Sequence, residues 1–194
     1  FLGGVAGNVA AGFAGIGTVF AGIATGSLAI ASNFEQLNAR LVAVTGSVTI
    51  ANQKIEAAKT FAAESPFDLA GAVRATATLE SYKQSSEELL PVAAALAAGM
   101  GTDLQQATLA VGKAASGSAE AWSQLRDTYG ITSDEIIRFG GVASKSGGLL
   151  DYSTQSVQKN REALIKLVNL RFGDAVAKQS ATLAGAMSNV GDAA

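Results

Sequence analysis

Apolar positions spaced alternately by four and three residues are the feature that most constrains the fold of this chain. The pattern covers residues 2–62, and Ser27 is its only polar member. A sustained 3.5-residue repeat keeps an apolar stripe on one face of a left-handed coiled coil. One continuous helix over these residues would measure about 90 Å at ~1.5 Å per residue. The members with large side chains, where the register is clearest, are Val9, Phe13, Ile16, Phe20, Ile23, Ile30, Phe34, Leu37, Leu41, Val44, Val48 and Ile55.

One short stretch interrupts the good helix formers of this pattern. Thr45, Gly46 and Ser47 combine a glycine with two residues of low helix propensity. If the long helix is broken, we expect the break at this point.

Residues 1–34 carry no ionisable side chain, and Glu35 is the first. A helix needs ~20 mostly apolar residues to cross a bilayer, so this segment is long enough to cross once. Burial, or an interface between subunits, explains the same composition equally well. The segment has no basic start and is not typical of a signal peptide. Because the chain begins with Phe, we expect it to be a piece of a longer protein.

Small residues recur at helical spacing in the same segment. The pairs are Gly3 with Gly7 and Gly22 with Gly26. Such pairs let helices approach closely in lipid. Because each glycine also weakens a helix in water by about 1 kcal/mol relative to alanine, we expect residues 1–34 to need partner helices or a bilayer.

The composition excludes several classes of function. The 194 residues include no Cys and no His, so there is no disulfide framework, no thiolate or imidazole metal site and no Ser-His-Asp triad. The 14 basic and 16 acidic residues give a net charge of −2. Such a balance supplies no global basic field for sequence-specific nucleic-acid binding.

The rest of the chain is punctuated by signals for short helices. Ser65 and Pro66 suit the cap and first turn of a helix that runs to about Tyr82. After a polar turn over 83–88, Pro91 is expected to open an alanine-rich helix.

Further starts and stops follow at short intervals. Residues 102–105 match a capping box, and Ser118 and Ser133 are expected to cap two more helices. Gly130 and Gly140 are expected to end those two helices. The pattern predicts no alternation of strands and helices and therefore no parallel sheet.

The last part of the chain combines a glycine-rich stretch with a further helix. Residues 140–154 hold four glycines and two short apolar patches, which favour a small hairpin or an ordered loop. A stripe of apolar residues over 157–172 predicts a helix that Gly173 ends. We therefore predict an all-α fold with an uncharged segment over 1–34, a coiled-coil-like helix over 35–64 and a compact helical domain over 65–194.

No residue pattern in the chain indicates catalysis, a cofactor or a metal. The acidic pairs 87–88 and 134–135 lie at expected helix starts, where they stabilise the helix dipole. Trp122 and Tyr129 are most simply core aromatics. The basic side chains of 159–171 alternate with acidic ones, which is typical of a solvated helix face. We therefore expect the protein not to be an enzyme.

Several stretches, in this order and spacing, resemble the tail tape measure proteins of long-tailed bacteriophages and prophages. They lie at residues 31–47, 65–67, 98–107, 123–130, 138–141 and 170–192. The chain departs from the family where Lys83 follows Tyr82, since the family often has glycine there, and in a short loop after Gly141.

The resemblance implies a structural role. Tape measure proteins are long, mostly helical, and lie in several parallel copies inside the tail tube, where their length sets the tail length. Tape measure proteins leave the tube ahead of the DNA, and their hydrophobic segments are thought to enter the host inner membrane. The apolar stripe over residues 2–62 is compatible with a coiled coil of two, three or more helices. The resemblance implies tail tube and tail tip proteins as partners, and no catalytic residues.

Two other interpretations remain open on the residues alone. A pore-forming or secreted helical effector also combines a hydrophobic segment with an all-α domain. A coiled-coil scaffold without membrane contact would explain the stripe without any need for lipid.

Overall fold

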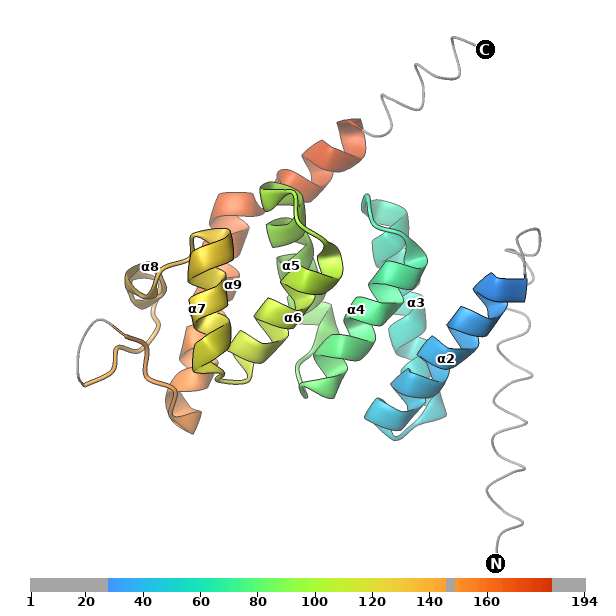
Figure 1. Ribbon diagram of the computed structural model, residues 1–194, viewed down its shortest axis with the longest axis horizontal. Coiled ribbons are helices and arrows are strands. Elements are labelled where there is room, and N and C mark those ends of the chain that lie inside the picture. The colour runs from blue at the N-terminus through green and yellow to red at the C-terminus, as the bar shows by residue number, and fades with distance from the viewer. Residues whose placement is uncertain (1–27, 146–148, 183–194) are drawn as a thin grey trace, which may run out of the picture. The chain divides into compact units, whose positions relative to one another are not determined.

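The computed structural model describes residues 28–145 and 149–182 (Figure 1), with side chains from residue 35 onward. Within these residues the fold is all-α, as predicted. The helices are α2 (Leu28–Thr45), α3 (Val48–Glu64), α4 (Leu69–Ser81), α5 (Ser86–Met100), α6 (Leu104–Ala115), α7 (Ala119–Tyr129), α8 (Ser133–Arg138) and α9 (Thr154–Phe172). Residues 175–182 are also helical.

The chain divides into two compact units, residues 1–52 and residues 53–194. The predicted boundary between a coiled-coil-like helix and a compact domain lay at residue 64, whereas α3 contributes most of its length to the second unit. The polar contacts of Lys54 with α4 and α5 account for this, because they hold α3 on the helical domain.

The long helix does not continue through residues 45–48, so the expectation of one helix over 2–62 is wrong there. Gly46 has a φ of 69°, a left-handed conformation that ends α2, and its N–H donates to the Val42 carbonyl at 2.8 Å. Ser47 Oγ then accepts the N–H of Ile50 at 3.3 Å and caps α3. The break lies where the sequence placed it.

The side chains of the apolar stripe that the structure describes are buried or half-buried. Leu41 is fully buried, and Leu37, Val44 and Val48 are half-buried. Ile55, in the second unit, is 6% exposed.

The remaining stripe residues and the small-residue pairs belong to residues 1–34. Ile30 and Phe34 belong to α2 through their backbone only. The others lie outside the described residues, at Val9, Phe13, Ile16, Phe20, Ile23, Gly3, Gly7, Gly22 and Gly26.

The core of the second unit is built mainly around α5 and α6. In Figure 1, α6 lies between α4 and α7, and α9 runs behind α7. The helix α9 packs against both α5 and α6. Leu89, Leu96, Val111, Leu125 and Leu164 are fully buried there, and alanines fill much of the space between them. Small side chains at these positions let the helices pack closely, so alanine serves as core material in this domain.

Several helices begin a few residues away from the predicted cap. Asp68, and not Ser65, caps α4 by accepting the N–H of Gly71. Asp103 caps α6 by accepting the N–H groups of Gln105 and Gln106, so residues 102–105 form no capping box. Both observed caps are carboxylates at the positive end of the helix dipole, where negative charge is stabilising.

Two other predicted caps give opposite outcomes. Ser118 caps α7, as predicted, by accepting the N–H of Ala121 at 3.3 Å. The helix α8 is capped by Thr132 where Ser133 was expected, because Thr132 and Glu135 form a reciprocal capping box.

Pro91 lies inside α5 and does not open it. The helix begins five residues earlier at Ser86, so the predicted polar turn over 83–88 is shorter than expected. The carboxylate of Glu80, at the end of α4, accepts the N–H of Ser86 at 3.1 Å. Because the free N–H at the start of α5 is bound by a side chain of another helix, the start of α5 needs no side-chain cap from the neighbouring sequence.

The glycine-rich segment over 140–154 folds back on itself. Ala143 and Leu150 form an isolated antiparallel bridge, and the N–H of Asp151 donates to the Val142 carbonyl at 2.8 Å. Asn160 of α9, 1% exposed, accepts the N–H of Val142 at 2.7 Å and donates to the Asp151 carbonyl at 2.8 Å. One buried amide therefore holds both arms of this segment against α9.

Candidate functional site

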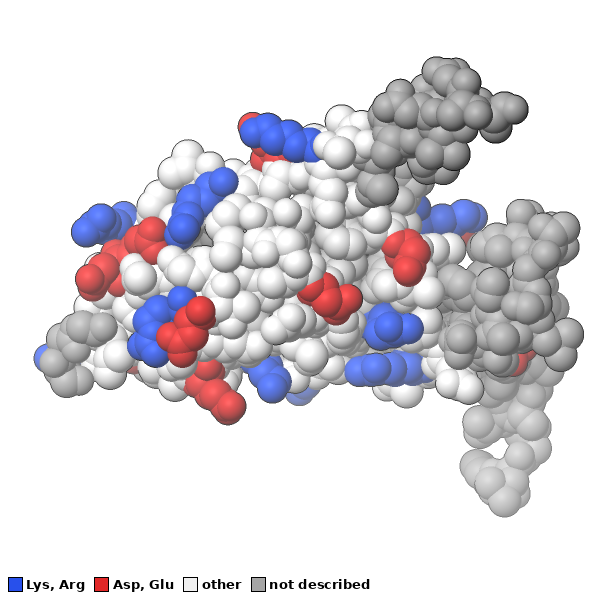
Figure 2. Space-filling model, turned by 45° about the horizontal axis from the view of Figure 1, so that its top comes forward, with Lys and Arg blue, Asp and Glu red and all other residues white. Residues whose placement is uncertain are grey.

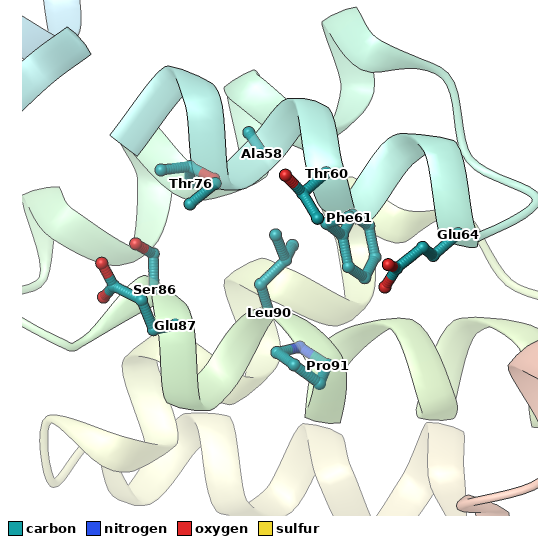
Figure 3. Close-up of a pocket in the computed structure, with 10 residues that line it drawn as sticks. Ala58, Thr60, Phe61, Glu64, Thr76, Ser86, Glu87, Leu90 and Pro91 are labelled. Carbon is teal, nitrogen blue, oxygen red and sulfur yellow. The ribbon is translucent and has the colours of Figure 1, made fainter. Parts of the chain in front are cut away.

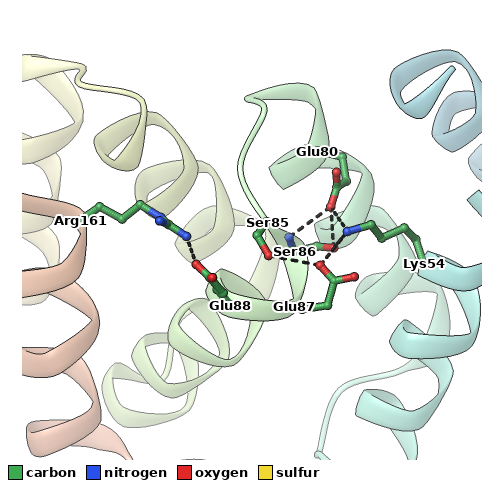
Figure 4. Close-up of polar contacts among 7 residues, drawn as sticks. All are labelled: Lys54, Glu80, Ser85, Ser86, Glu87, Glu88 and Arg161. Carbon is green, nitrogen blue, oxygen red and sulfur yellow. Dashed lines mark hydrogen bonds and ion pairs between the residues drawn. The ribbon is translucent and has the colours of Figure 1, made fainter. Parts of the chain in front are cut away.

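The acidic pair at the start of α5 is divided between two neighbouring helices. Glu87 pairs with Lys54 of α3, and Glu88 pairs with Arg161 of α9 (Figure 4). Glu87 and Glu88 are both about half-exposed, whereas Arg161 is largely buried. The two carboxylates therefore fix the position of α5 between α3 and α9 and do not act together as an acid–base pair.

Lys54 is the centre of a polar network that the sequence patterns did not indicate. Its ammonium lies 2.7 Å from Glu80 Oε1, 2.6 Å from Glu87 Oε2 and 3.4 Å from Ser86 Oγ. Ser86 Oγ donates to Glu80 Oε1 at 2.7 Å. Figure 4 shows these side chains converging from α3, α4 and α5. The side chains of Lys54 and Glu80 are only 14% and 16% exposed, so the network is largely shielded from water.

The electrostatics of this network favour its charged form. Burial alone lowers the pKa of Lys54, but hydrogen bonds and attraction from Glu80 and Glu87 outweigh burial and hold that pKa above its usual value. The hydrogen bond from Lys54 is the main cause that lowers the pKa of Glu87. A lysine with a raised pKa is a poor nucleophile and a poor base at neutral pH.

An apolar pocket of about 390 Å³ lies beside the network, between α3 and α5, with Thr76 of α4 also lining it (Figure 3). Its apolar wall comes from Ala58 and Phe61 of α3 and from Leu90 and Pro91 of α5. Glu64 and Glu87 also line it, from α3 and α5 respectively. The pocket has the composition of a site for an apolar side chain and lacks a set of groups that could carry a reaction.

The basic side chains expected along one face of α9 have different surroundings. Arg161 is buried against Glu88, and Arg171 donates to the Gly130 carbonyl at 3.1 Å and to Glu135 at 3.3 Å. Lys159 and Lys166 are exposed. In the view of Figure 2, acidic and basic side chains are interspersed and much of the described surface is uncharged. With Arg161 and Arg171 both paired to acidic side chains, α9 offers no continuous basic patch for nucleic acid within the described residues.

The other candidate residues take structural positions. Trp122 and Tyr129 are buried in the core, as expected. Asp134 and Glu135 lie in the first turn of α8. Gly141, in the 138–141 stretch, has no room for a side chain, because an added Cβ would lie 2.8 Å from the Ile136 carbonyl oxygen.

The described residues hold neither a cluster of metal ligands nor a membrane-spanning helix. Over 28–145 and 149–182, no group of three or more acidic side chains is placed to hold a metal ion. Among the helices of these ranges, none is long and apolar enough to cross a bilayer. No protein-family model, curated protein or solved structure matches the chain.

Proposed function

We propose that this chain is a segment of the tail tape measure protein of a long-tailed bacteriophage or prophage. The observation that carries the proposal is the ordered series of short stretches over residues 31–192 that resemble this family. The all-α fold of the described residues agrees with the mostly helical nature of such proteins.

Backbone geometry supports the resemblance at two of its positions. Lys83 has a φ of 56°, a conformation that glycine adopts more readily, and the family often has glycine at this position. Gly130, which ends the 123–130 stretch, is the left-handed cap of α7 with a φ of 64°. The left-handed backbone at both positions favours glycine, and a family that shares this fold is expected to have the same preference there.

In the proposed role the protein lies in several parallel copies inside the tail tube and sets the tail length. It contacts tail tube and tail tip proteins in the virion. On infection it leaves ahead of the DNA, and the uncharged segment over 1–34 enters the host inner membrane. No cofactor or catalytic residue is part of this role.

A domain that leaves through a narrow tube must deform at low force. Short helices and a core rich in alanine offer few large interlocking side chains to resist extension. We expect the second unit to unfold at low force in single-molecule pulling. Forces as high as those of rigid β-sandwich domains would contradict this part of the proposal.

The location of the protein in the virion tests the proposed function. Peptides of this chain should be found by mass spectrometry in purified virions of the phage that encodes it. They should resist protease while the tails are intact and become sensitive once the tails have ejected their DNA. A chain absent from virions, or cleaved equally before and after ejection, would refute the proposal.

The two other interpretations predict different behaviour. A pore-forming effector would release dye from liposomes as the isolated chain, without any virion component. A scaffold without membrane contact would show the same solubility and oligomeric state for residues 35–194 as for the full chain, as measured by sedimentation.

A further inference from the structure

The pocket between α3 and α5 lies on a helix face with a regular order of residues. Ala57, Thr60, Phe61 and Glu64 line it from α3 at helical positions i, i+3, i+4 and i+7. This is the spacing with which a helix presents one face to a neighbouring helix. Figure 3 shows Phe61 and Leu90 between the two helices, with Glu64 farther along α3. The pocket therefore suits an apolar side chain delivered by another helix.

The carboxylate of Glu64 has no partner among the described residues, because no ion pair or hydrogen bond reaches it over 35–145 and 149–182. Glu64 is exposed, one helical turn beyond Phe61. A basic side chain on the occupant would complete this edge of the pocket.

The helix α9 carries an exposed leucine and an exposed lysine that match the apolar pocket and the carboxylate of Glu64. Leu170 is 73% exposed, more than the other large apolar residues that the described part of the chain exposes. Lys166 is exposed one turn before it, and within the described residues it forms no ion pair. Residues four apart lie on the same helix face, so Leu170 and Lys166 form an apolar knob with a cation beside it.

We propose that the pocket between α3 and α5 binds Leu170 of a second copy of this chain. With Leu170 above Phe61, Lys166 of the second copy reaches Glu64 when α9 runs antiparallel to α3. One contact then places an exposed leucine in an apolar pocket and pairs two free charges of opposite sign. The proposal does not depend on the tape measure function, because it uses only side chains of the second unit.

Cysteine cross-linking tests this contact directly, because the chain has no cysteine of its own. Full-length Thr60→Cys, carrying a mass tag, is mixed with separately purified Asn169→Cys, which keeps Leu170, and treated with a short bismaleimide. We expect a mixed dimer at several times the yield obtained when Lys159→Cys replaces Asn169→Cys. Lys159 is the matched control, since it is exposed on the same helix, about 15 Å from Asn169 at ~1.5 Å per residue.

Exchanging the charges of Glu64 and Lys166 distinguishes this contact from association through residues 1–34. Glu64→Lys in the Thr60→Cys partner, or Lys166→Glu in the Asn169→Cys partner, should each lower the cross-linking yield several-fold. Combining the two should restore most of the yield. Equal yields for Asn169→Cys and Lys159→Cys, or no restoration in the combined pair, would overturn the proposal. Circular dichroism of each variant checks that the helices are intact.

Discussion

The ammonium group of Lys54 lies 2.7 Å from the carboxylate of Glu80, and the same carboxylate accepts the N–H of Ser86 at the first turn of α5. One acidic side chain at the end of α4 therefore accepts a hydrogen bond from the first turn of α5 and also pairs with a largely buried ammonium group. This arrangement connects α3, α4 and α5 at the edge of the pocket proposed to bind a second copy.

Removing the cation should destabilise the fold. In Lys54→Met the apolar stem remains, but Glu80 and Glu87 lose their partner and Glu80 stays largely buried. We expect a loss of about 2 kcal/mol in the free energy of unfolding, measured by urea denaturation. Lys59→Met is the control, since Lys59 is exposed and lies 3.8 Å from Glu56, and its loss should stay below about 0.5 kcal/mol. Equal losses would show that the network is not stabilising.

The pH dependence of stability should be flat near neutrality and fall at both extremes. The pKa of Glu87 is lowered in the folded state, so its contribution is present above the unfolded pKa and is lost as the pH falls through the folded value. The pKa of Lys54 is raised, so its contribution is lost as the pH rises through the folded value. Without histidine, no unperturbed side chain titrates between these limits.

The variant Glu87→Gln isolates the acidic limb of this profile. Its urea midpoint should be lower than that of the original chain at pH 7, and the difference should shrink as the pH falls below about 4. A difference that stays constant down to pH 2 would contradict the assigned cause.

Replacing Lys83 by glycine should stabilise the protein. Lys83 has a φ of 56°, where a side chain is strained and glycine is not. We expect Lys83→Gly to gain about 0.5–1 kcal/mol in the free energy of unfolding. Lys113→Gly is the matched control, because Lys113 is an exposed residue of helix α6 and the same change there should cost about 1 kcal/mol. A loss in both variants would argue against the left-handed conformation of Lys83.

The loop over 140–154 should depend on Asn160. In Asn160→Ala the half-buried Val142 loses the acceptor of its N–H, and the carbonyl of Asp151 loses its donor, at a cost of about 2 kcal/mol. Hydrogen exchange should show faster exchange at the Val142 amide, while amides in α5 remain protected. Asn169→Ala, on the exposed side of α9, is the control and should change neither measurement. Unchanged exchange at Val142 would contradict the proposed role of Asn160.

Local signals in the sequence predicted most of the helices but not the contacts between them. The break at Gly46 and the helix end at Gly130 both depend on a left-handed residue, which glycine signals directly. The cap of α4 was misplaced, because both Ser65 and Asp68 have suitable side chains and only packing decides between them.

The candidate site was not predictable from local patterns. Lys54 meets Glu87 across 33 residues of sequence, and no periodicity connects these positions. The start of α5 was missed for the same reason, since its acceptor belongs to the preceding helix. The burial of Ile55, which is 6% exposed, agrees with its place in the apolar stripe.

Tail length tests the proposed function most directly. An in-frame duplication of these 194 residues in the encoding phage is compared with the parent by electron microscopy of purified tails. We predict longer tails, by up to about 290 Å if the added residues extend as helix at ~1.5 Å each. Tails of unchanged length, with the duplicated protein present in the virions, would contradict the account.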